Sequence, residues 1–325
     1  MLRFVIRRSL GAALILLVIS AVTFFLFFAL PSDPARLSCG KQCTPESLLL
    51  IRHNLGIDTP LPYQYWHFLT GIFVGRSVGG TNCPAPCLGY SFVNNEPVLQ
   101  TLLNRFPATL SITAGACTLI LTVGIGLGIL AALRRGKPVD KISMGAALVG
   151  ASVQIYFFGI VARYIFVDQL DWLARPGYTS PFTSLTGWAG GMLLPWVTLA
   201  VVNVAVYARF SRSSMLEALS EEYVRAVRAK GLGAAGVYLK HAWRGAMTPV
   251  VTLFGIDLGV MLGGALITET TFNVPGIGKL AVDSVAAADL PMIMGTVLFA
   301  STAMVLANVA VDACYALIDP RVRTS

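Results

Sequence analysis

The stretch SLGAALILLVISAVTFFLFFAL, residues 9–30, decides the fold class, because it contains no charged residue along its whole length. A helix rises about 1.5 Å per residue, so about 20 apolar residues cross a hydrocarbon core of about 30 Å. The run exceeds the apolar core of a signal peptide, which has about 7–15 residues, and no small-x-small cleavage site follows it. We therefore expect residues 1–30 to form a retained N-terminal transmembrane anchor.

The composition of the whole chain also indicates a location in lipid. Of 325 residues, 55% are apolar and only 12% are charged, whereas about a quarter of the residues of a soluble domain are charged. The sequence predicts an all-α membrane protein with six transmembrane helices. Besides residues 9–30, the expected spans are 108–133, 142–167, 189–210, 250–268 and 292–317.

The basic residues predict the orientation of these helices. They cluster near the N-terminus, in the loops 134–141 and 209–244, and in the C-terminal tail. By the positive-inside rule these segments are cytoplasmic, and so are both termini. The net charge of +8 is therefore explained by membrane topology, and the partner it implies is membrane lipid, with no nucleic acid.

The segment between the first two spans is an extracytoplasmic insert, residues 31–96, followed by a membrane core, residues 97–318. The insert contains Cys39, Cys43, Cys83 and Cys87. In an oxidising compartment these favour two disulfides, whose pairing stays open. The alternative is a structural zinc site built from the two C-x3-C pairs, with help from His53 or His67.

The cytoplasmic loop, residues 211–249, contains local helix signals. Ser214 and Glu217 fit a capping box that would begin a helix. Ser220 is then expected to cap a second helix of about ten residues. Lys230 followed by Gly231 predicts its end, because glycine accepts the left-handed conformation there.

The second helix presents two kinds of side chain. Tyr223 and Val227 form an apolar stripe, and Arg225 and Arg228 lie on another side. A helix this short is marginal in water, so something must pack on it. Two interpretations stay open on these residues alone: an amphipathic helix on anionic lipid, or a projection that enters a groove of a partner protein.

Several motifs are similar to those of one transporter family. The run EYVRAVRAKGL, residues 222–232, resembles the coupling loop of permease subunits of binding-protein-dependent peptide importers. Similar family motifs are HAWRGAMTPVVT (241–252), ARFSRSSMLE (208–217), TETTF (268–272), PGIG (275–278), LGID (55–58) and RFPATL (105–110). Together they resemble the B-type subunit of the dipeptide/oligopeptide/nickel ABC importer family.

This resemblance implies an ABC importer type I permease fold in the cell inner membrane, with an extracytoplasmic insert after the first helix. It also implies a homologous second permease subunit, two ABC ATPase subunits, an extracytoplasmic solute-binding protein and a peptide substrate. ATP and Mg would be bound by the ATPases, so this chain would have no cofactor, no metal and no catalytic residue. The residues expected to contact an ATPase are Glu217, Tyr223, Arg225, Arg228, Lys230 and Gly231.

Two polar residues within the spans are candidates for the translocation pathway. Asp257 lies near the middle of the fifth span, and Asn203 lies in the fourth. An intramembrane charge is costly and marks a functional hypothesis. Asp257 would contact a peptide amino group, pair with the partner subunit or remain protonated. Gly255, Gly259 and Gly263, four residues apart, predict close helix packing.

Two alternatives stay open, and nucleotide binding by this chain is excluded. A nickel or other small-solute permease of the same family is the nearest. A secondary transporter would show duplicated halves, and no repeat is visible. Nucleotide binding by this chain would need a P-loop, but Leu280 follows Gly276-Ile-Gly-Lys279 where a hydroxyl residue is required.

Overall fold

The computed structural model describes residues 2–29, 33–39, 44–55, 59–78, 81–233 and 236–318, most of which are helical. Among them, five helical segments are long and apolar enough to cross a membrane, and a bent pair makes six if it is counted as one span. The expected all-α membrane protein is confirmed. The location of the two termini stays a prediction.

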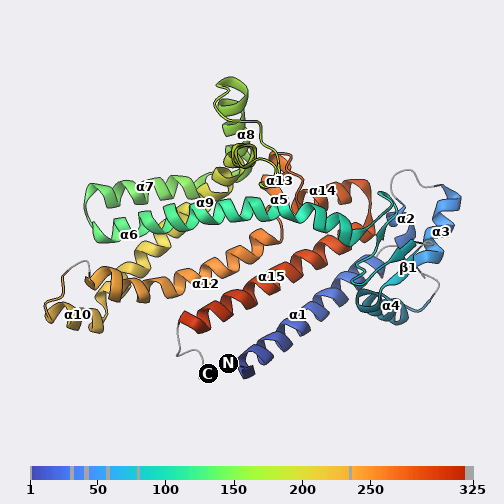
Figure 1. Ribbon diagram of the computed structural model, residues 1–325, viewed down its shortest axis with the longest axis horizontal. Coiled ribbons are helices and arrows are strands. Elements are labelled where there is room, and N and C mark those ends of the chain that lie inside the picture. The colour runs from blue at the N-terminus through green and yellow to red at the C-terminus, as the bar shows by residue number, and fades with distance from the viewer. Residues whose placement is uncertain are drawn as a thin grey trace.

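The long helices run side by side and form an elongated bundle (Figure 1). The helix α5 continues through the π-helical turn η1 into α6, so one segment reaches from residue 98 to residue 133. The elements of the bundle are α1 (Leu2–Phe28), α5 (Val98–Leu119), η1 (Ile120–Gly124), α6 (Ile125–Leu133), α7 (Pro138–Ser152), α9 (Leu185–Ser220), α12 (Trp243–Leu262) and α15 (Leu290–Ile318).

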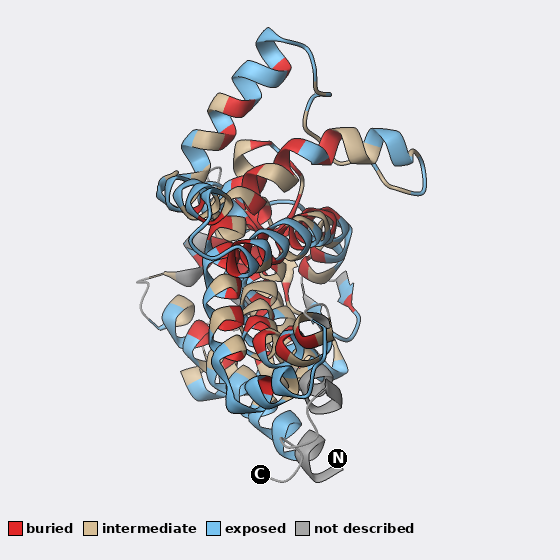
Figure 2. Cartoon of the chain, turned by 90° about the vertical axis from the view of Figure 1, so that its left-hand side faces the viewer, coloured by how far each residue is buried: buried red, intermediate tan, exposed pale blue. Residues whose placement is uncertain are grey.

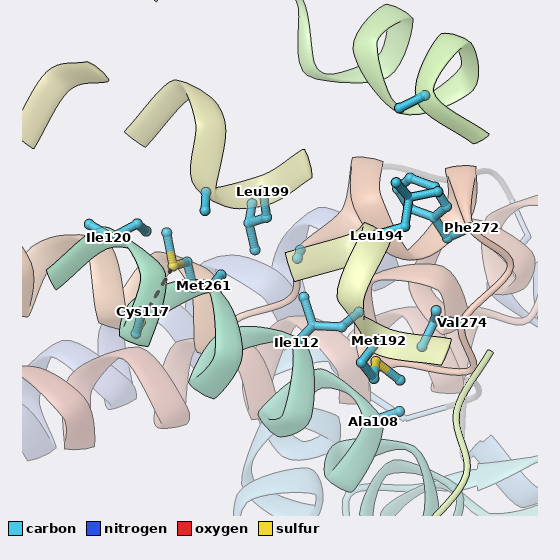
Figure 3. Close-up of a cluster of buried hydrophobic side chains, with 14 of the residues drawn as sticks. Ala108, Ile112, Cys117, Ile120, Met192, Leu194, Leu199, Met261, Phe272 and Val274 are labelled. Carbon is cyan, nitrogen blue, oxygen red and sulfur yellow. Dashed lines mark hydrogen bonds between the residues drawn. The ribbon is translucent and has the colours of Figure 1, made fainter. Parts of the chain in front are cut away.

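The largest buried cluster lies where α5, α9 and α12 meet (Figure 3). Ile112 of α5 and Met192 of α9 are fully buried within it. Cys117 of α5 lies beside Met261 of α12, with 3.8 Å between the sulfur atoms. This contact joins two segments that are 144 residues apart in the sequence.

The helix α12 packs closely on α15 through two glycines. A β-carbon at Gly255 would clash with Val311, and one at Gly259 would lie 3.1 Å from Met304. The close packing expected from glycine spacing is therefore confirmed for these two positions. Gly263 has another role, because it follows Leu262 as the C-cap of α12.

The expected span 142–167 is not one helix. It is divided into α7 and α8 (Ile155–Arg163), which meet at 96° and are followed by the π-helical turn η2 (Tyr164–Gln169). Val153 and Gln154 have extended backbone conformations and make the bend. The α8–η2 segment projects from the bundle and is mainly exposed (Figure 2). Apolar composition does not reveal such a bend, because the apolar residues continue across it.

The expected span 250–268 is also shifted. The helix α12 begins at Trp243 and ends at Leu262, and Gly264 then turns the chain with a φ of 123°. Two short helices follow, α13 (Leu266–Thr271) and α14 (Ile277–Ala287). Thr268 therefore belongs to the connection between the last two spans and not to a span.

The described residues of the insert form three short helices and two small hairpins. Cys83 and Cys87 are joined by a disulfide. Cys39 is also disulfide-bonded, and Cys43 lies outside the described residues. The elements of the insert are α2 (Pro34–Ser38), α3 (Pro45–Leu55), α4 (Leu61–Val74), β1 (Arg76–Val78) paired antiparallel with β2 (Thr81–Cys83), and β3 (Tyr90–Ser91) paired antiparallel with β4 (Glu96–Pro97).

The insert is bonded to the bundle at the start of α15. The Ser91 hydroxyl donates to the carboxylate of Asp289 at 2.5 Å, and Asp289 accepts from the backbone amide of Met292 at 3.2 Å. Burial raises the pKa of Asp289, which is almost inaccessible to solvent. This contact holds the second hairpin against the end of a transmembrane helix.

Candidate functional site

The coupling loop begins at the end of an unusually long helix. The helix α9 has 36 residues, which corresponds to about 54 Å against about 30 Å for the hydrocarbon core. It therefore extends beyond the membrane at one end. The short helix α10 (Glu222–Ala229) follows it, at the opposite end of the molecule from the insert (Figure 1).

The local helix signals in this loop were only partly correct. Ser214 and Glu217 do not begin a helix, because α9 runs through them to Ser220. The Ser220 hydroxyl donates to the Glu217 carbonyl, and Glu221 occupies the N-cap position of α10 without a side-chain bond. The propensity of α9 to continue therefore outweighs the capping signal.

The end of α10 agrees with the expectation from the sequence. Lys230 is its C-cap, and Gly231 has a φ of 81°. A residue with a side chain is disfavoured in this left-handed conformation. Open space surrounds Gly231, so the backbone alone requires glycine here.

The apolar side of α10 packs on the chain itself. Val224 is fully buried, and Val227 packs against the same cluster. The cluster includes Met215 of α9 and Ala246 of α12. The expected stripe of Tyr223 and Val227 is therefore not free for a groove in a partner protein. Val227 is half-buried and packs on the chain's own cluster.

Tyr223 links α10 to the start of α12. Its hydroxyl donates to the His241 carbonyl at 3.4 Å, within the π-helical turn η3 (Val237–Ala242). A β-carbon at Gly245 would lie 2.7 Å from the Tyr223 oxygen. The absence of a side chain at Gly245 therefore makes room for the tyrosine. The helix α10 is thus held between two spans.

The outward side of α10 is polar and basic. Arg225, Arg228 and Lys230 are all exposed, and Tyr223 is 46% exposed. Glu217, near the end of α9, is exposed as well. The structure thus brings the six sequence-predicted coupling residues into one region. This surface can form charged contacts with an acidic partner without any change in the packing of the helix.

A partly buried ion pair supports α9 between two and three turns before α10, and sequence reasoning missed it. Arg212 of α9 binds Asp140 of α7 through two hydrogen bonds, at 2.6 and 2.9 Å. The amide of Gly136 donates to the same carboxylate at 2.9 Å. A possible signal was that Asp140 is the one acidic residue in the basic loop 134–141.

We expect Asp140→Ala and Arg212→Ala each to lower the unfolding temperature, because each leaves a largely buried charge without its partner. The double variant should lose little more than either single variant, since both remove the same interaction. Thermal unfolding of the purified protein, followed by intrinsic fluorescence, measures these shifts.

The control for these three variants is Asp283→Ala, which breaks an exposed ion pair with Lys279. Exposed pairs contribute little to stability, so this variant should behave like the unmodified protein. If the decreases in unfolding temperature caused by Asp140→Ala and Arg212→Ala added up in the double variant, the result would contradict the stabilising ion pair.

The two candidate pathway residues lie on α9 and α12. Asp257 is half-buried and accepts a hydrogen bond from Tyr207 at 2.8 Å. Asn203 donates to the Leu199 carbonyl of its own helix at 2.9 Å. Sequence reasoning did not identify Tyr207, which is almost fully buried. Asp257 thus joins the two spans in the structure.

Another buried carboxylate lies in the connection between the last two spans. Glu269 of α13 accepts from the Thr109 hydroxyl of α5 at 2.7 Å and from the Lys279 amide of α14 at 2.9 Å. Thr109 in turn accepts from the Ile277 amide. A β-carbon at Gly276 would clash with the Glu269 carboxylate. The motifs TETTF and PGIG are therefore two halves of one contact.

Burial raises the pKa of Glu269, and its hydrogen bonds offset part of that effect. The carboxylate is fully inaccessible to solvent. It satisfies amides in the first turn of α14, where a helix has free N–H groups and favours negative charge. Glu269 therefore fixes the connection between the last two spans against α5.

The structure combines a long helical bundle, a loop with the short helix α10 at one end, and the connection α13–α14 between the last two spans. Together these features are typical of a permease subunit. Comparison with known families shows which one. Residues 1–113 match the N-terminal model, and residues 124–324 match the core model, of the binding-protein-dependent transport system inner membrane component. The chain belongs to this family, and it is a multi-pass subunit of an ABC importer in the inner membrane.

Individual relatives align over the whole chain. It is similar to the glutathione transport system permease protein GsiC of Salmonella choleraesuis and of Pectobacterium atrosepticum, with 38% identity over 323 residues. The identity to GsiC of Escherichia coli K12 is 37%. In each case 99% of both chains is covered. As a permease subunit, this chain is not itself an ATPase; a solute-binding protein and separate ATPase subunits are its partners.

Proposed function

We propose that this chain forms part of the transmembrane pathway of an ATP-driven importer of small peptides. The observation that supports coupling is the exposed basic side of α10, held at the end of the 36-residue helix α9. The peptide class rests on the relatives, which are named as glutathione permeases. Glutathione is a tripeptide, so a small peptide is the substrate class we assign.

In this proposal α10 is the contact with the ATPase. Arg225, Arg228 and Lys230 bind an acidic surface, and Glu217 and Tyr223 contact the ATPase beside them. The Tyr223 hydroxyl also positions the helix through its bond to the His241 carbonyl. Gly231 ends it, so that the chain can turn back towards α12. ATP and Mg are bound by two ATPase subunits, and this chain supplies mechanical contacts instead of catalytic groups.

Movement of α10 is transmitted because the helix is packed on both neighbouring spans. Val224 is buried against α9 and α12, and Tyr223 reaches the start of α12. A packed contact passes on a rigid-body shift instead of absorbing it. The ATPase cycle would thus change how α9 and α12 sit against a homologous second permease subunit.

We assign the translocation pathway to a position beside α9 and α12. Asn203 of α9 and Asp257 of α12 are the candidate contacts with the substrate. Both side chains already have partners within the chain. A peptide amino group would therefore compete with the Tyr207 hydroxyl for Asp257. Such competition allows a weak, reversible contact, which transport requires.

The proposed substrate class is tested in proteoliposomes that contain both permeases and both ATPases, supplied with the solute-binding protein. We expect ATP-dependent accumulation of labelled glutathione or of a dipeptide. ATP hydrolysis should rise when the binding protein is loaded with peptide. Accumulation of Ni²⁺ that peptides do not inhibit would instead identify the nickel branch and contradict the peptide assignment.

A further inference from the structure

The helix α4 of the insert has an unusual surface for a segment outside the membrane. Its sequence, LPYQYWHFLTGIFV, contains no Asp, Glu, Lys or Arg. Tyr63, Trp66, Phe73 and Val74 are between 53% and 82% exposed. In water, the exposure of so many large apolar groups would be energetically unfavourable.

The position of α4 along α1 is set by specific contacts. The Tyr65 hydroxyl lies 3.0 Å from the Ser20 hydroxyl and 3.4 Å from the Leu17 carbonyl. The Phe24 ring lies 5.4 Å from that of Tyr65 and 5.6 Å from that of Phe68. These contacts involve the apolar part of α1, which ends at Phe28.

These contacts give the depth of α4. By helical rise, Phe24 lies about 6 Å and Ser20 about 12 Å before the end of the span. The apolar segment of α1 has 22 residues, or about 33 Å, which barely exceeds a hydrocarbon core of about 30 Å. A helix beside these residues therefore lies within the membrane and not in the water above it.

Several polar side chains of α4 are satisfied within the chain, as lipid requires. On the exposed side, His67 Nε2 lies 3.0 Å from the Tyr63 hydroxyl, and the Thr70 hydroxyl donates to the Trp66 carbonyl at 2.9 Å. On the buried side, the Gln64 amide donates to the Thr59 carbonyl at 2.6 Å.

The exposed side of α4 also continues an apolar surface of α1. Phe25 of α1 is 41% exposed, and its ring lies 5.8 Å from that of Tyr65. Val22 and Leu26 are exposed beside it. Since α1 is a membrane span, this continuous surface faces lipid. Tyrosine and tryptophan are enriched at the membrane–water interface.

We infer that α4 is an interfacial helix immersed in the leaflet on the insert's side, with Tyr63, Trp66, Phe73 and Val74 in contact with lipid. The first hairpin of the insert follows this helix directly, because β1 begins at Arg76. The helix α4 anchors the insert at a fixed height above the pathway entrance, which stabilises a surface for the solute-binding protein.

Tryptophan quenching tests this inference. The full-length chain, with the subunits that accompany it, is placed in nanodiscs whose lipids carry bromine on their acyl chains. The emission that Trp66→Phe removes should be the part that brominated lipid quenches and that aqueous iodide does not. The matched control is Trp188→Phe, because Trp188 packs against the core cluster and against Trp196. That variant should leave the lipid-quenched emission unchanged.

A second variant keeps the test informative if Trp66→Phe fails to fold. Phe73→Trp places a new indole on the same exposed side, and we expect it to add lipid-quenched emission. Quenching of the Trp66 emission by iodide alone would mean that α4 is in water. Quenching by neither agent would mean that another protein covers it. Either result would overturn the inference.

Discussion

Reversing the charges of Arg225 and Arg228 to glutamate should abolish ATP-dependent uptake while the protein still folds and inserts normally. Both side chains are exposed on α10. In the part of the chain that the structure describes, neither forms an ion pair. Breaking one charge pair at an interface costs about 2 kcal/mol, or about 30-fold in affinity. Uptake and co-purification of the ATPases measure the effect.

The matched control is the same charge reversal at Arg134 and Arg135. These arginines are exposed in the loop between α6 and α7, on an element other than α10, so membrane topology experiences the same change in charge. This control should retain ATPase binding. If the Arg225/Arg228 variant inserted normally and transported at the unmodified rate, α10 would not be the coupling contact.

Glu269→Ala should cause a large decrease in the free energy of unfolding. It leaves the Lys279 amide and the Thr109 hydroxyl without their acceptor, and it leaves a cavity because Glu269 is fully buried. Each buried unsatisfied group costs about 1–3 kcal/mol, so the total is about 3 kcal/mol or more. Thermal unfolding in detergent measures the loss, and uptake should fall with it.

Two further variants test whether the packing around Glu269, and not only its carboxylate, stabilises the protein. Gly276→Ala should also destabilise the protein, since its β-carbon would clash with the Glu269 carboxylate. Gly177→Ala is the matched control, because nothing lies within 4 Å of a β-carbon there. Equal unfolding temperatures for these two glycine variants would contradict the proposed role of Glu269.

The raised pKa of Glu269 also predicts a pH dependence. Because burial raises this pKa in the folded state, the folded protein binds the proton more tightly than the unfolded chain does. The free energy of unfolding should therefore decrease as pH rises from the ordinary glutamate value through the raised one. Glu269→Gln does not titrate, so this component of the pH dependence should be absent from it.

Much of the site could be predicted because its signals are local. The run 222–232 located the short helix α10, and Gly231 marked its end through its backbone conformation. The burial of Val224 and Val227 could not be foreseen, since it depends on Met215 and on α12, which approach α10 only in the folded chain. The residues that face outwards were therefore only partly predictable.

The sequence by itself determined the membrane class, the approximate spans and the position of the short helix α10, because apolar length, charge clusters and glycine act within a few residues. Only the tertiary structure decided the bend between α7 and α8, the uninterrupted course of α9 and the pairs 109–269, 140–212 and 207–257. Members of each pair are between 50 and 160 residues apart. Their contacts form when helices pack, and no local pattern records which side chains will then meet.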